Sequence, residues 1–383
     1  MKYKLKDIFD LQMGKTPSRN NADYWNSKDN KWISIADLSK VDMYISETKE
    51  YLSDRAIKES GIKIIPANTV IMSFKLSLGK TAITTQDMYS NEAIMAFHDK
   101  HVVRMLPEYI FYILKYKNWD VDSNKAVMGK TLNKATLSNV EIEICSIEKQ
   151  IEIIQVLNKM MEIMSGKRKE LKFLDDLIKA RFVEMFGDLR TNTRGWDIKT
   201  FDELSYLITD GEHATPKRAT EGIYLLSARN ILNHSLQLTD VDYVDQEEYD
   251  RIAKRIVPQE GDVLISCSGT VGRCCSVPAN TKFQMVRSVA LIRFKEEVKP
   301  AFAEYMITSD YLQGQINSSK TTSSQANLFQ GKIKALKGFV PPIDLQNQFA
   351  DFVRHVDKSK VAIQKSLDET KLLFDSLMQE YFG

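Results

Sequence analysis

Cysteine is scarce in this sequence, and the cysteines that do occur form no recognisable site. The 383 residues contain four, Cys145, Cys267, Cys274 and Cys275, with no CxxC pair and no histidine at metal-ligand spacing. Neither a zinc site nor a disulfide framework is therefore expected. Cysteines without such a pattern are typical of core side chains in a reducing compartment.

Long apolar segments are also missing. No run approaches the roughly 18 apolar residues that a membrane-spanning helix needs. Residues 1–7 alternate lysines with other side chains, where a secretory signal would be apolar. We therefore expect a cytoplasmic protein with no membrane partner.

Motifs for catalysis are missing as well. The sequence has no GxxxxGK[ST] loop for ATP. It also lacks the Asn/Asp-Pro-Pro-aromatic motif and glycine-rich loop of an amino-methyltransferase, because Pro341-Pro342 lies between Val340 and Ile343 and indicates a strand-to-helix turn. We expect no catalytic residue, metal site or cofactor in this chain. None of the histidines accompanies a serine or cysteine nucleophile motif; these are His98, His101, His213, His234 and His355.

Neither sign of charge dominates the composition. Lysine and arginine total 53 and aspartate and glutamate 51, so the formal net charge is +2. The hydrophobic fraction of 43% and the charged fraction of 27% are ordinary for a globular protein. A chain of 383 residues exceeds one typical core, so two or more domains are expected. The charge permits a nucleic-acid partner if the cations cluster on one face.

What the sequence has instead is an internal repeat. Phe186-Gly187 ends a helical stretch in the middle of the chain, and Phe382-Gly383 ends another 196 residues later (382 − 186). Two tandem copies of one unit favour two similar binding surfaces. The other matched segments are residues 14–17 with 211–216, 32–38 with 224–231, 68–73 with 261–266, 79–80 with 272–273, 107–112 with 300–305, 128–133 with 323–328, and 140–144 with 338–342.

The matched segments predict the same elements twice. Residues 32–38 and 68–73, with their partners in the second half, are apolar strand-like runs, and a proline begins each helix at 107 and 300. Each half is thus predicted to be a mixed α/β domain of about 150 residues followed by a helix of about forty.

Both long helical stretches have coiled-coil spacing and no proline. Steps of three and four over about forty residues indicate a long helix packed along one seam, spanning roughly 60 Å. The simplest closure packs the two helices against each other as an antiparallel pair. The seam residues are Ile151, Ile154, Leu157, Met161, Met164, Leu171, Leu174, Ile178, Arg181 and Met185, and then Leu345, Phe349, Phe352, Val356, Ser359, Ile363, Leu367, Thr370, Phe374, Leu377 and Tyr381.

On these features the sequence resembles the specificity subunit of type I restriction–modification systems over essentially its whole length. The most specific parts are Ser73 with Gly79-Lys80 and Ser266 with Gly272-Arg273, together with the junction at 341–348. The resemblance implies an α+β fold, in which two tandem α/β target-recognition domains are joined by two long helices packed as an antiparallel coiled coil. The implied parts are the target-recognition domains 1–147 and 188–343, the central helical region 148–187 and the distal helical region 344–383.

The resemblance also implies a function. Each globular domain would recognise one half of a bipartite, asymmetric site in double-stranded DNA. The helices would set the spacing and bind two methyltransferase subunits, which bring S-adenosylmethionine. An endonuclease–translocase subunit is an optional further partner. The alternative is a coiled-coil scaffold with two protein-binding modules and no role on DNA, and positive charge on equivalent loops of both halves favours DNA.

Candidate DNA-binding residues are cations and polar side chains on the matched loops, because these groups contact phosphates and base edges. Lys75-Leu76 replaces Ser268-Gly269, so the two loops need not share a shape, and the halves are expected to recognise different bases. The candidates are Lys15, Arg19, Lys75, Lys80, Lys130, Asn133 and Lys134 in the first half, and Lys217, Arg218, Arg229, Asn230, Ser268, Arg273, Arg287, Lys320, Gln325 and Asn327 in the second.

Overall fold

The structure is a computed structural model that describes residues 1–75, 77–119, 132–319 and 327–383. Contacts between residues divide the chain into two compact units. Unit 1 comprises Met1–Lys167 and Ser366–Gly383, and unit 2 comprises Arg168–Lys365. Each unit therefore holds part of both long helices. The four-part division by function stays a prediction.

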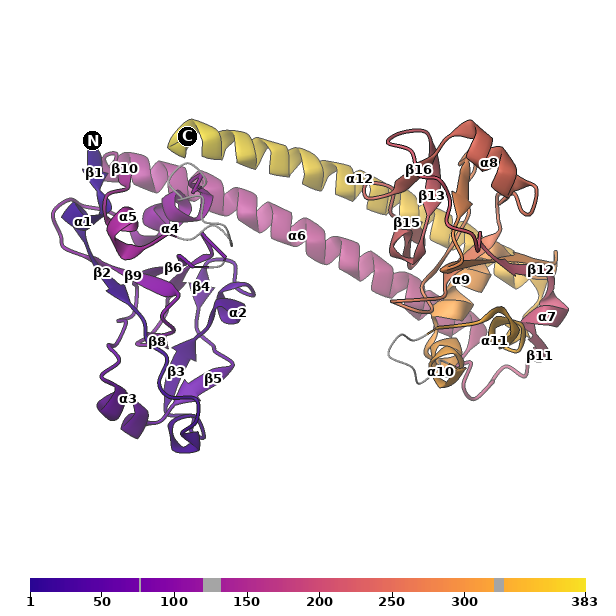
Figure 1. The fold of residues 1–383 in the computed structure, drawn as a ribbon, viewed down its shortest axis with the longest axis horizontal. Coiled ribbons are helices and arrows are strands. Elements are labelled where there is room, and N and C mark those ends of the chain that lie inside the picture. The colour runs from indigo at the N-terminus through magenta and orange to yellow at the C-terminus, as the bar shows by residue number, and fades with distance from the viewer. Residues whose placement is uncertain (76, 120–131, 320–326) are drawn as a thin grey trace. The chain divides into compact units, whose positions relative to one another are not determined.

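Unit 1 contains two β-sheets and one short strand pair (Figure 1). All neighbours in the larger sheet are antiparallel except β7 and β4. Its strand order is β2 (Phe9–Met13), β9 (Ile94–Asp99), β6 (Val70–Ser73), β7 (Thr81–Thr84) and β4 (Tyr44–Ile45). The smaller sheet has the order β5 (Glu50–Leu52), β3 (Asn30–Ile33) and β8 (Tyr89–Ser90), and β1 (Lys2–Lys4) pairs with β10 (Glu141–Glu143).

The strand predicted at 32–38 is shorter than expected. It ends at Ile33, because Ser34 forms a capping box with Asp37 and begins a helical turn. The predicted helix at Pro107 is present. The helices of unit 1 are α1 (Leu5–Ile8), α2 (Ile35–Leu38), α3 (Asp54–Ser60), α4 (Pro107–Tyr116) and α5 (Lys134–Ser138), with a 3-10 turn η1 (Ala22–Tyr24).

Unit 2 repeats this arrangement. Its four-stranded sheet is antiparallel, with the order β12 (Ser205–Asp210), β20 (Val289–Phe294), β17 (Val263–Ser266) and β18 (Cys274–Ser276). The smaller sheets are β16 (Asp242–Val244), β13 (Ile223–Leu226) and β19 (Phe283–Met285), then β14 (Ile231–Leu232) with β15 (Ser235–Leu236), and β11 (Asp197–Thr200) with β21 (Lys337–Val340). The helices are α7 (Phe201–Leu204), α8 (Gln246–Ala253), α9 (Pro300–Thr308), α10 (Asp310–Ser319) and α11 (Gln330–Lys334), with η2 (Ala228–Asn230).

The internal repeat is confirmed strand by strand. β2-β9-β6-β7 in unit 1 corresponds to β12-β20-β17-β18 in unit 2, and β5-β3-β8 corresponds to β16-β13-β19. The strands β6 and β17 each follow a residue in the left-handed conformation, Asn68 at φ 61° and Gly261 at φ 84°. Only glycine and, less often, asparagine adopt this conformation readily, which explains the turn predicted before both strands.

The two long helices are α6 (Ile147–Phe186) and α12 (Ile343–Phe382), each of 40 residues, as predicted. In unit 1, Lys149 Nζ lies 5.8 Å from the centre of the Tyr381 ring. Further along, Lys167 Nζ donates a hydrogen bond to Ser366 Oγ at 2.8 Å. Rising numbers on α6 meet falling numbers on α12, so the pair is antiparallel here.

The helix pair within unit 2 is antiparallel by the same criterion. Asp175 and Lys360 form an ion pair at 2.6 Å, and the rings of Phe182 and Phe349 are 5.4 Å apart. The predicted seam is wrong at Ile151, which is 44% exposed, and at Ser359, which is also exposed. The side chains of Gln150 and Ile153 take the buried positions in the turn around Ile151 instead.

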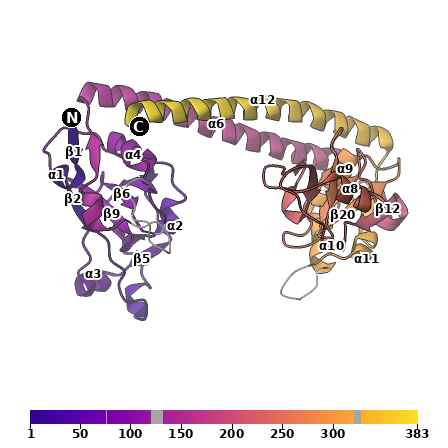
Figure 2. The same cartoon turned by 45° about the horizontal axis from the view of Figure 1, so that its top comes forward.

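In each unit one short helix lies between the larger sheet and the long helices (Figures 1 and 2). In unit 1 the ring of Tyr109 on α4 is 5.5 Å from Phe382 at the end of α12. In unit 2 the ring of Phe302 on α9 is 4.7 Å from Phe186 at the end of α6. The repeated Phe-Gly helix ends are therefore packing sites for equivalent helices. Among the described residues, no helix has the length and apolar character needed to cross a membrane.

Candidate nucleic-acid interface

The antiparallel register of the larger sheet in unit 1 brings three loops to one end. Ser73, the last residue of β6, pairs with Ile94, the first of β9. Met13, the last residue of β2, pairs with the next residue of β9. The segments after β2, between β6 and β7, and before β9 therefore meet. We call residues 14–16, 74–80 and 91–93 the loop end of unit 1; residue 76 lies outside the described residues.

Unit 2 brings the equivalent loops together. Ser266, the last residue of β17, pairs with Val289, the first of β20. Asp210, the last residue of β12, pairs with Ala290. We call residues 211–213, 267–273 and 286–288 the loop end of unit 2. The sequence prediction thus selected loops that the topology gathers at one place in each unit.

A buried serine anchors the central loop in both units. Lys80 N donates to Ser73 Oγ at 3.1 Å, and Arg273 N donates to Ser266 Oγ at 3.0 Å. The preceding glycines have φ values of 81° and 92°, and each donates its N–H to the carbonyl of the same serine. Few side chains tolerate that conformation, so the turn requires the glycine, whereas the cation that follows contributes only its backbone N–H to the turn. The two loops therefore share this hydrogen-bonded turn, although the sequence left their shapes open.

A second segment reaches the loop end of unit 2. Leu328 N donates to Cys267 O at 2.9 Å, and Ser268 forms a β-bridge with Asn327. The candidates Ser268 and Asn327, far apart in the sequence, therefore lie side by side.

Unit 1 has the equivalent contact. Leu132 N donates to Phe74 O at 3.2 Å, which brings the start of α5 to the loop end. The candidate Asn133 caps this helix, since its Oδ1 accepts from Thr136 N at 2.7 Å. Its side chain thus has a structural role in the turn.

Three candidate cations of unit 1 are bound to groups of their own unit. The Arg19 guanidinium makes two hydrogen bonds to the Glu50 carboxylate and lies 3.7 Å from the centre of the Trp25 ring. Lys15 Nζ donates to a backbone carbonyl, and Lys80 Nζ donates to a serine hydroxyl, each at 2.5 Å. The charge of Arg19 is therefore largely balanced, whereas Lys15 and Lys80 keep theirs.

Three candidates of unit 2 are likewise tied into its structure. Arg218 and Arg229 each lie 3.1 Å from the carboxylate of Asp242. Asn230 is fully buried, and its Oδ1 accepts from Ser227 N at 2.9 Å in a capping box. Asn230 occupies the place that Asp37 has in unit 1, so the turn after β3 and β13 is held in the same way.

The remaining candidates differ in what surrounds them. Five cations make no ion pair with any described residue and are at least partly exposed; these are Lys75, Lys134, Lys217, Arg273 and Arg287. Lys130, Lys320 and Gln325 lie outside the described residues, so the structure adds nothing about them.

The sequence reasoning missed two carboxylates at the loop ends. In unit 1, Thr16 Oγ1 donates a hydrogen bond to the Glu92 carboxylate. This bond, together with nearby cations, lowers the pKa of Glu92, so the group is charged at neutral pH. In unit 2, Glu212 lies 3.6 Å from Arg251 and accepts from a backbone N–H at 3.0 Å. Their importance was hidden because Glu92 and Glu212 have no acidic counterpart in the other half.

The predicted core role is confirmed for three of the four cysteines. Cys267, Cys274 and Cys275 are buried, and all four thiols are free. Burial raises the pKa of Cys267 to about 12, so this thiol stays protonated and unreactive at neutral pH. Over the described ranges, no group of three or more histidine, cysteine, aspartate or glutamate side chains is placed to hold a metal ion.

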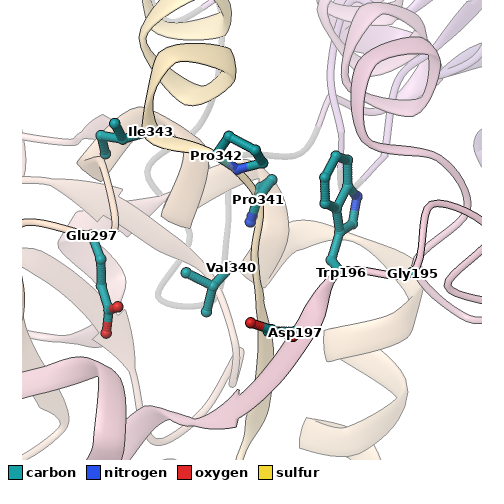
Figure 3. A pocket seen from close by; sticks show the side chains of 8 residues that line it. All are labelled: Gly195, Trp196, Asp197, Glu297, Val340, Pro341, Pro342 and Ile343. Atoms are coloured by element: carbon teal, nitrogen blue, oxygen red, sulfur yellow. The ribbon is translucent and has the colours of Figure 1, made fainter.

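A shallow cavity of about 390 Å³ lies where β21 turns into α12 (Figure 3). Pro341 and Pro342 line it, so the turn predicted there is present. Trp196, on its opposite side, donates from Nε1 to Phe186 O at 2.8 Å and so closes the end of α6. The lining includes two acids, Asp197 and Glu297, and no cation, which makes it a poor surface for DNA. Glu297 forms an ion pair with Lys199 at 3.0 Å.

The fold and the loop ends together define a class of protein. It is a duplicated α+β protein in which each unit has a cation-bearing loop end and part of an antiparallel helix pair. The model of one family, Type I restriction modification DNA specificity domain, matches residues 1–172 and 195–370. The two matches include most of both halves, and the chain belongs to this family.

Curated relatives agree with this assignment. The chain is 26% identical over 220 residues to the type I restriction enzyme MjaIX specificity subunit of Methanocaldococcus jannaschii. This alignment covers 52% of this chain and 50% of that protein. It is 22% identical over 381 residues to the EcoprrI specificity subunit of Escherichia coli, covering 92% and 86%. The chain thus spans half of the first relative and most of the second.

Solved structures share the fold. An S subunit of a type I restriction–modification system from M. genitalium aligns over 100% of this chain and 96% of that chain, with a TM-score of 0.56 and 13% identity. A chain from a study of complex assembly and conformational transition of the type I R-M system aligns over 100% and 97%, with a TM-score of 0.60 and 15% identity. The comparisons support the specificity-subunit interpretation over the scaffold without a DNA role.

Proposed function

We propose that this chain is the DNA-recognition subunit of a type I restriction–modification complex. The loop end of unit 1 contacts one half-site of double-stranded DNA, and the loop end of unit 2 contacts the other. The observation that carries this proposal is the equivalence of Lys80 and Arg273. Each is a cation whose backbone is anchored to a buried serine at the same place in its loop end. Membership in the family supports the same function.

The electrostatics of the loop ends suit a polyanion. Lys75 and Arg273 make no ion pair with a described residue, so neither has to leave a carboxylate before it neutralises a phosphate. Each phosphate neutralised releases condensed counterions, which makes affinity fall with salt. Arg218 and Arg229, held by Asp242, contribute less to this attraction.

Methyl transfer takes place in partner subunits under this proposal. Two methyltransferase subunits bind the helical regions 148–187 and 344–383 and bring S-adenosylmethionine, and this chain supplies no catalytic residue. An endonuclease–translocase subunit is the further partner that cleavage requires. The whole complex works in the cytoplasm, where its DNA is.

The test uses the chain assembled with its methyltransferase subunits. With S-adenosylmethionine, the complex should methylate one bipartite motif in a library of random DNA sequences, and its DNA affinity should fall steeply with salt. The isolated chain should neither methylate, cleave nor hydrolyse ATP. Methyl transfer by the isolated chain, or methylation by the complex without any sequence preference, would overturn the proposal.

A further inference from the structure

One structurally equivalent position has opposite charge in the two units. In unit 1, Asn91 N donates to Ile33 O at 3.1 Å, and Ala93 O accepts from Phe74 N at 3.0 Å. Glu92 lies between these two anchors.

The same two anchors occur in unit 2. Val286 N donates to Leu226 O at 2.9 Å, and Ser288 O accepts from Cys267 N at 2.8 Å. Arg287 lies between them. The backbones of Glu92 and Arg287 are therefore held in the same place at the two loop ends, and both side chains are exposed.

The charge reversal separates two kinds of DNA contact. The phosphate backbone has the same charge at every sequence, so a position that contacts phosphate should be cationic in both units. Lys80 and Arg273 meet this condition. A position that contacts base edges should instead vary with the base, because bases present either donors or acceptors in the major groove. Glu92 and Arg287 meet the second condition.

The side chains of both residues remain available for such a contact. Glu92 accepts from Thr16 Oγ1 and from a backbone N–H. Lys75 and Arg19 lie close enough to lower its pKa. A carboxylate has about four acceptor sites, so acceptor capacity remains for a base. The Arg287 guanidinium makes no ion pair with a described residue, since the adjacent Glu212 is engaged by Arg251 at 3.6 Å. Lys15 and Glu212 are a second pair of equivalent positions with opposite charge. Their side chains already have partners in their own units, because Lys15 donates to a backbone carbonyl and Glu212 pairs with Arg251.

We propose that Glu92 and Arg287 are the base-contacting, specificity-determining residues of the two half-sites. A carboxylate accepts from the N4 amino group of cytosine, and an arginine donates two hydrogen bonds to O6 and N7 of guanine. Each half-site thus contains a C·G pair at the position that this residue contacts. Thr16 is a positioning residue, because its hydroxyl fixes the Glu92 carboxylate. The inference rests on the proposed function, since it needs the loop ends to contact DNA.

The experiment measures the methylated motif of the assembled complex on random-sequence DNA, for wild type, Glu92→Gln and Arg287→Gln. Each variant should lose about 5- to 150-fold of its discrimination at one C·G position of one half-site, with the other half-site unchanged. The matched controls remove a charge at the opposite end of the same sheets. Asp10→Asn and Lys295→Gln should leave the motif as in wild type.

A second pair of variants separates base contact from phosphate contact. Arg287→Lys keeps the charge but loses the planar fork, so it should relax discrimination at the same position, although less than Arg287→Gln does, because lysine can still donate to O6 and N7 of guanine. Glu92→Asp shortens the carboxylate and should act in the same way in the other half-site. These conservative variants also decide the question if a glutamine variant fails to assemble.

The experiment distinguishes failure of the proposed function from failure of the residue assignment. If the wild-type complex showed no sequence preference, the proposed function itself would be wrong. A specific wild-type complex whose motif survives all four substitutions would overturn only the assignment of Glu92 and Arg287. If Arg287→Gln weakened binding to all sequences alike and lowered the slope of log affinity against log salt by about one, Arg287 would be a phosphate contact and the assignment would be wrong.

Discussion

Gln150 and Gln346 make the same set of hydrogen bonds in the two units. Both are fully buried in the first turn of a long helix. Each amide oxygen accepts from the N–H of the residue before α4 or α9, at 2.9 and 2.8 Å. Each amide nitrogen donates to two backbone carbonyls, at 2.8 to 3.1 Å. One side chain thus joins each long helix to its globular part.

Replacing this amide should destabilise the protein. Gln150→Leu and Gln346→Leu each remove the partner of one backbone donor and two backbone acceptors at largely part-buried positions, so each should lower the free energy of unfolding by about 1–3 kcal/mol. Urea unfolding followed by circular dichroism measures the change. Gln155→Leu and Gln348→Leu, at exposed positions of the same helices, should have little effect. Equal losses in all four variants would show that the amides contribute nothing specific.

The long helices were predictable because their signals are local. Steps of three and four and the absence of proline act within a few residues, and both helices have the predicted length. Gln150 was not predictable, because a glutamine near a helix start usually faces solvent and its acceptor Arg104 O lies 46 residues away in the chain. The error at Ile151 follows, since Gln150 occupies the buried side of that turn.

Two glycines of unit 2 should respond to alanine with opposite signs. A Cβ at Gly211 would lie 2.3 Å from Met285 O, so Gly211→Ala forces the backbone apart and should destabilise by at least about 1–3 kcal/mol. Gly314, inside α10, has open space, so Gly314→Ala should stabilise by about 0.5–1 kcal/mol. Thermal unfolding midpoints should move in opposite directions. A gain of stability in Gly211→Ala would contradict the close approach of the two strands.

Lys80 and Arg273 should behave as phosphate contacts. Lys80→Gln and Arg273→Gln should each weaken DNA binding by the assembled complex on every sequence alike and reduce the slope of log affinity against log salt by about one. The methylated motif should not change. Titrations at several salt concentrations measure the slope. Lys100→Gln and Lys295→Gln, beyond the opposite ends of β9 and β20, are the matched controls. If neither test variant alters affinity, the loop ends are not the DNA surface.

The site was predictable only in part. The repeat identified Lys80 and Arg273 because each follows a glycine that the turn requires. It did not show which cations are already balanced, because such pairings join residues far apart in the chain. Arg19 meets Glu50 31 residues later, and Arg229 meets Asp242 only once β13 and β16 are paired. Glu92 could not be selected from the sequence, because its equivalence to Arg287 follows only from matching backbone hydrogen bonds in the two units.

The helix pair should set the spacing of the two half-sites. Helices of 40 residues are roughly 60 Å long, which is under two turns of B-DNA at about 34–36 Å per turn. We therefore predict half-sites centred about one turn apart, with a non-specific spacer between them.

The test lengthens both helices together. Lys167 Nζ donates to Ser366 Oγ at 2.8 Å, so insertions of about four residues beside each of these positions keep the antiparallel pairing while adding roughly 6 Å. The methylated motif should keep both half-sites and gain one or two base pairs of spacer, at roughly 3.4 Å each. An insertion in α6 alone, which shifts one seam against the other, should reduce stability and serves as the control. A folded, active double-insertion variant with an unchanged spacer would refute the role of the helices in spacing, because nothing else in the change touches the loop ends.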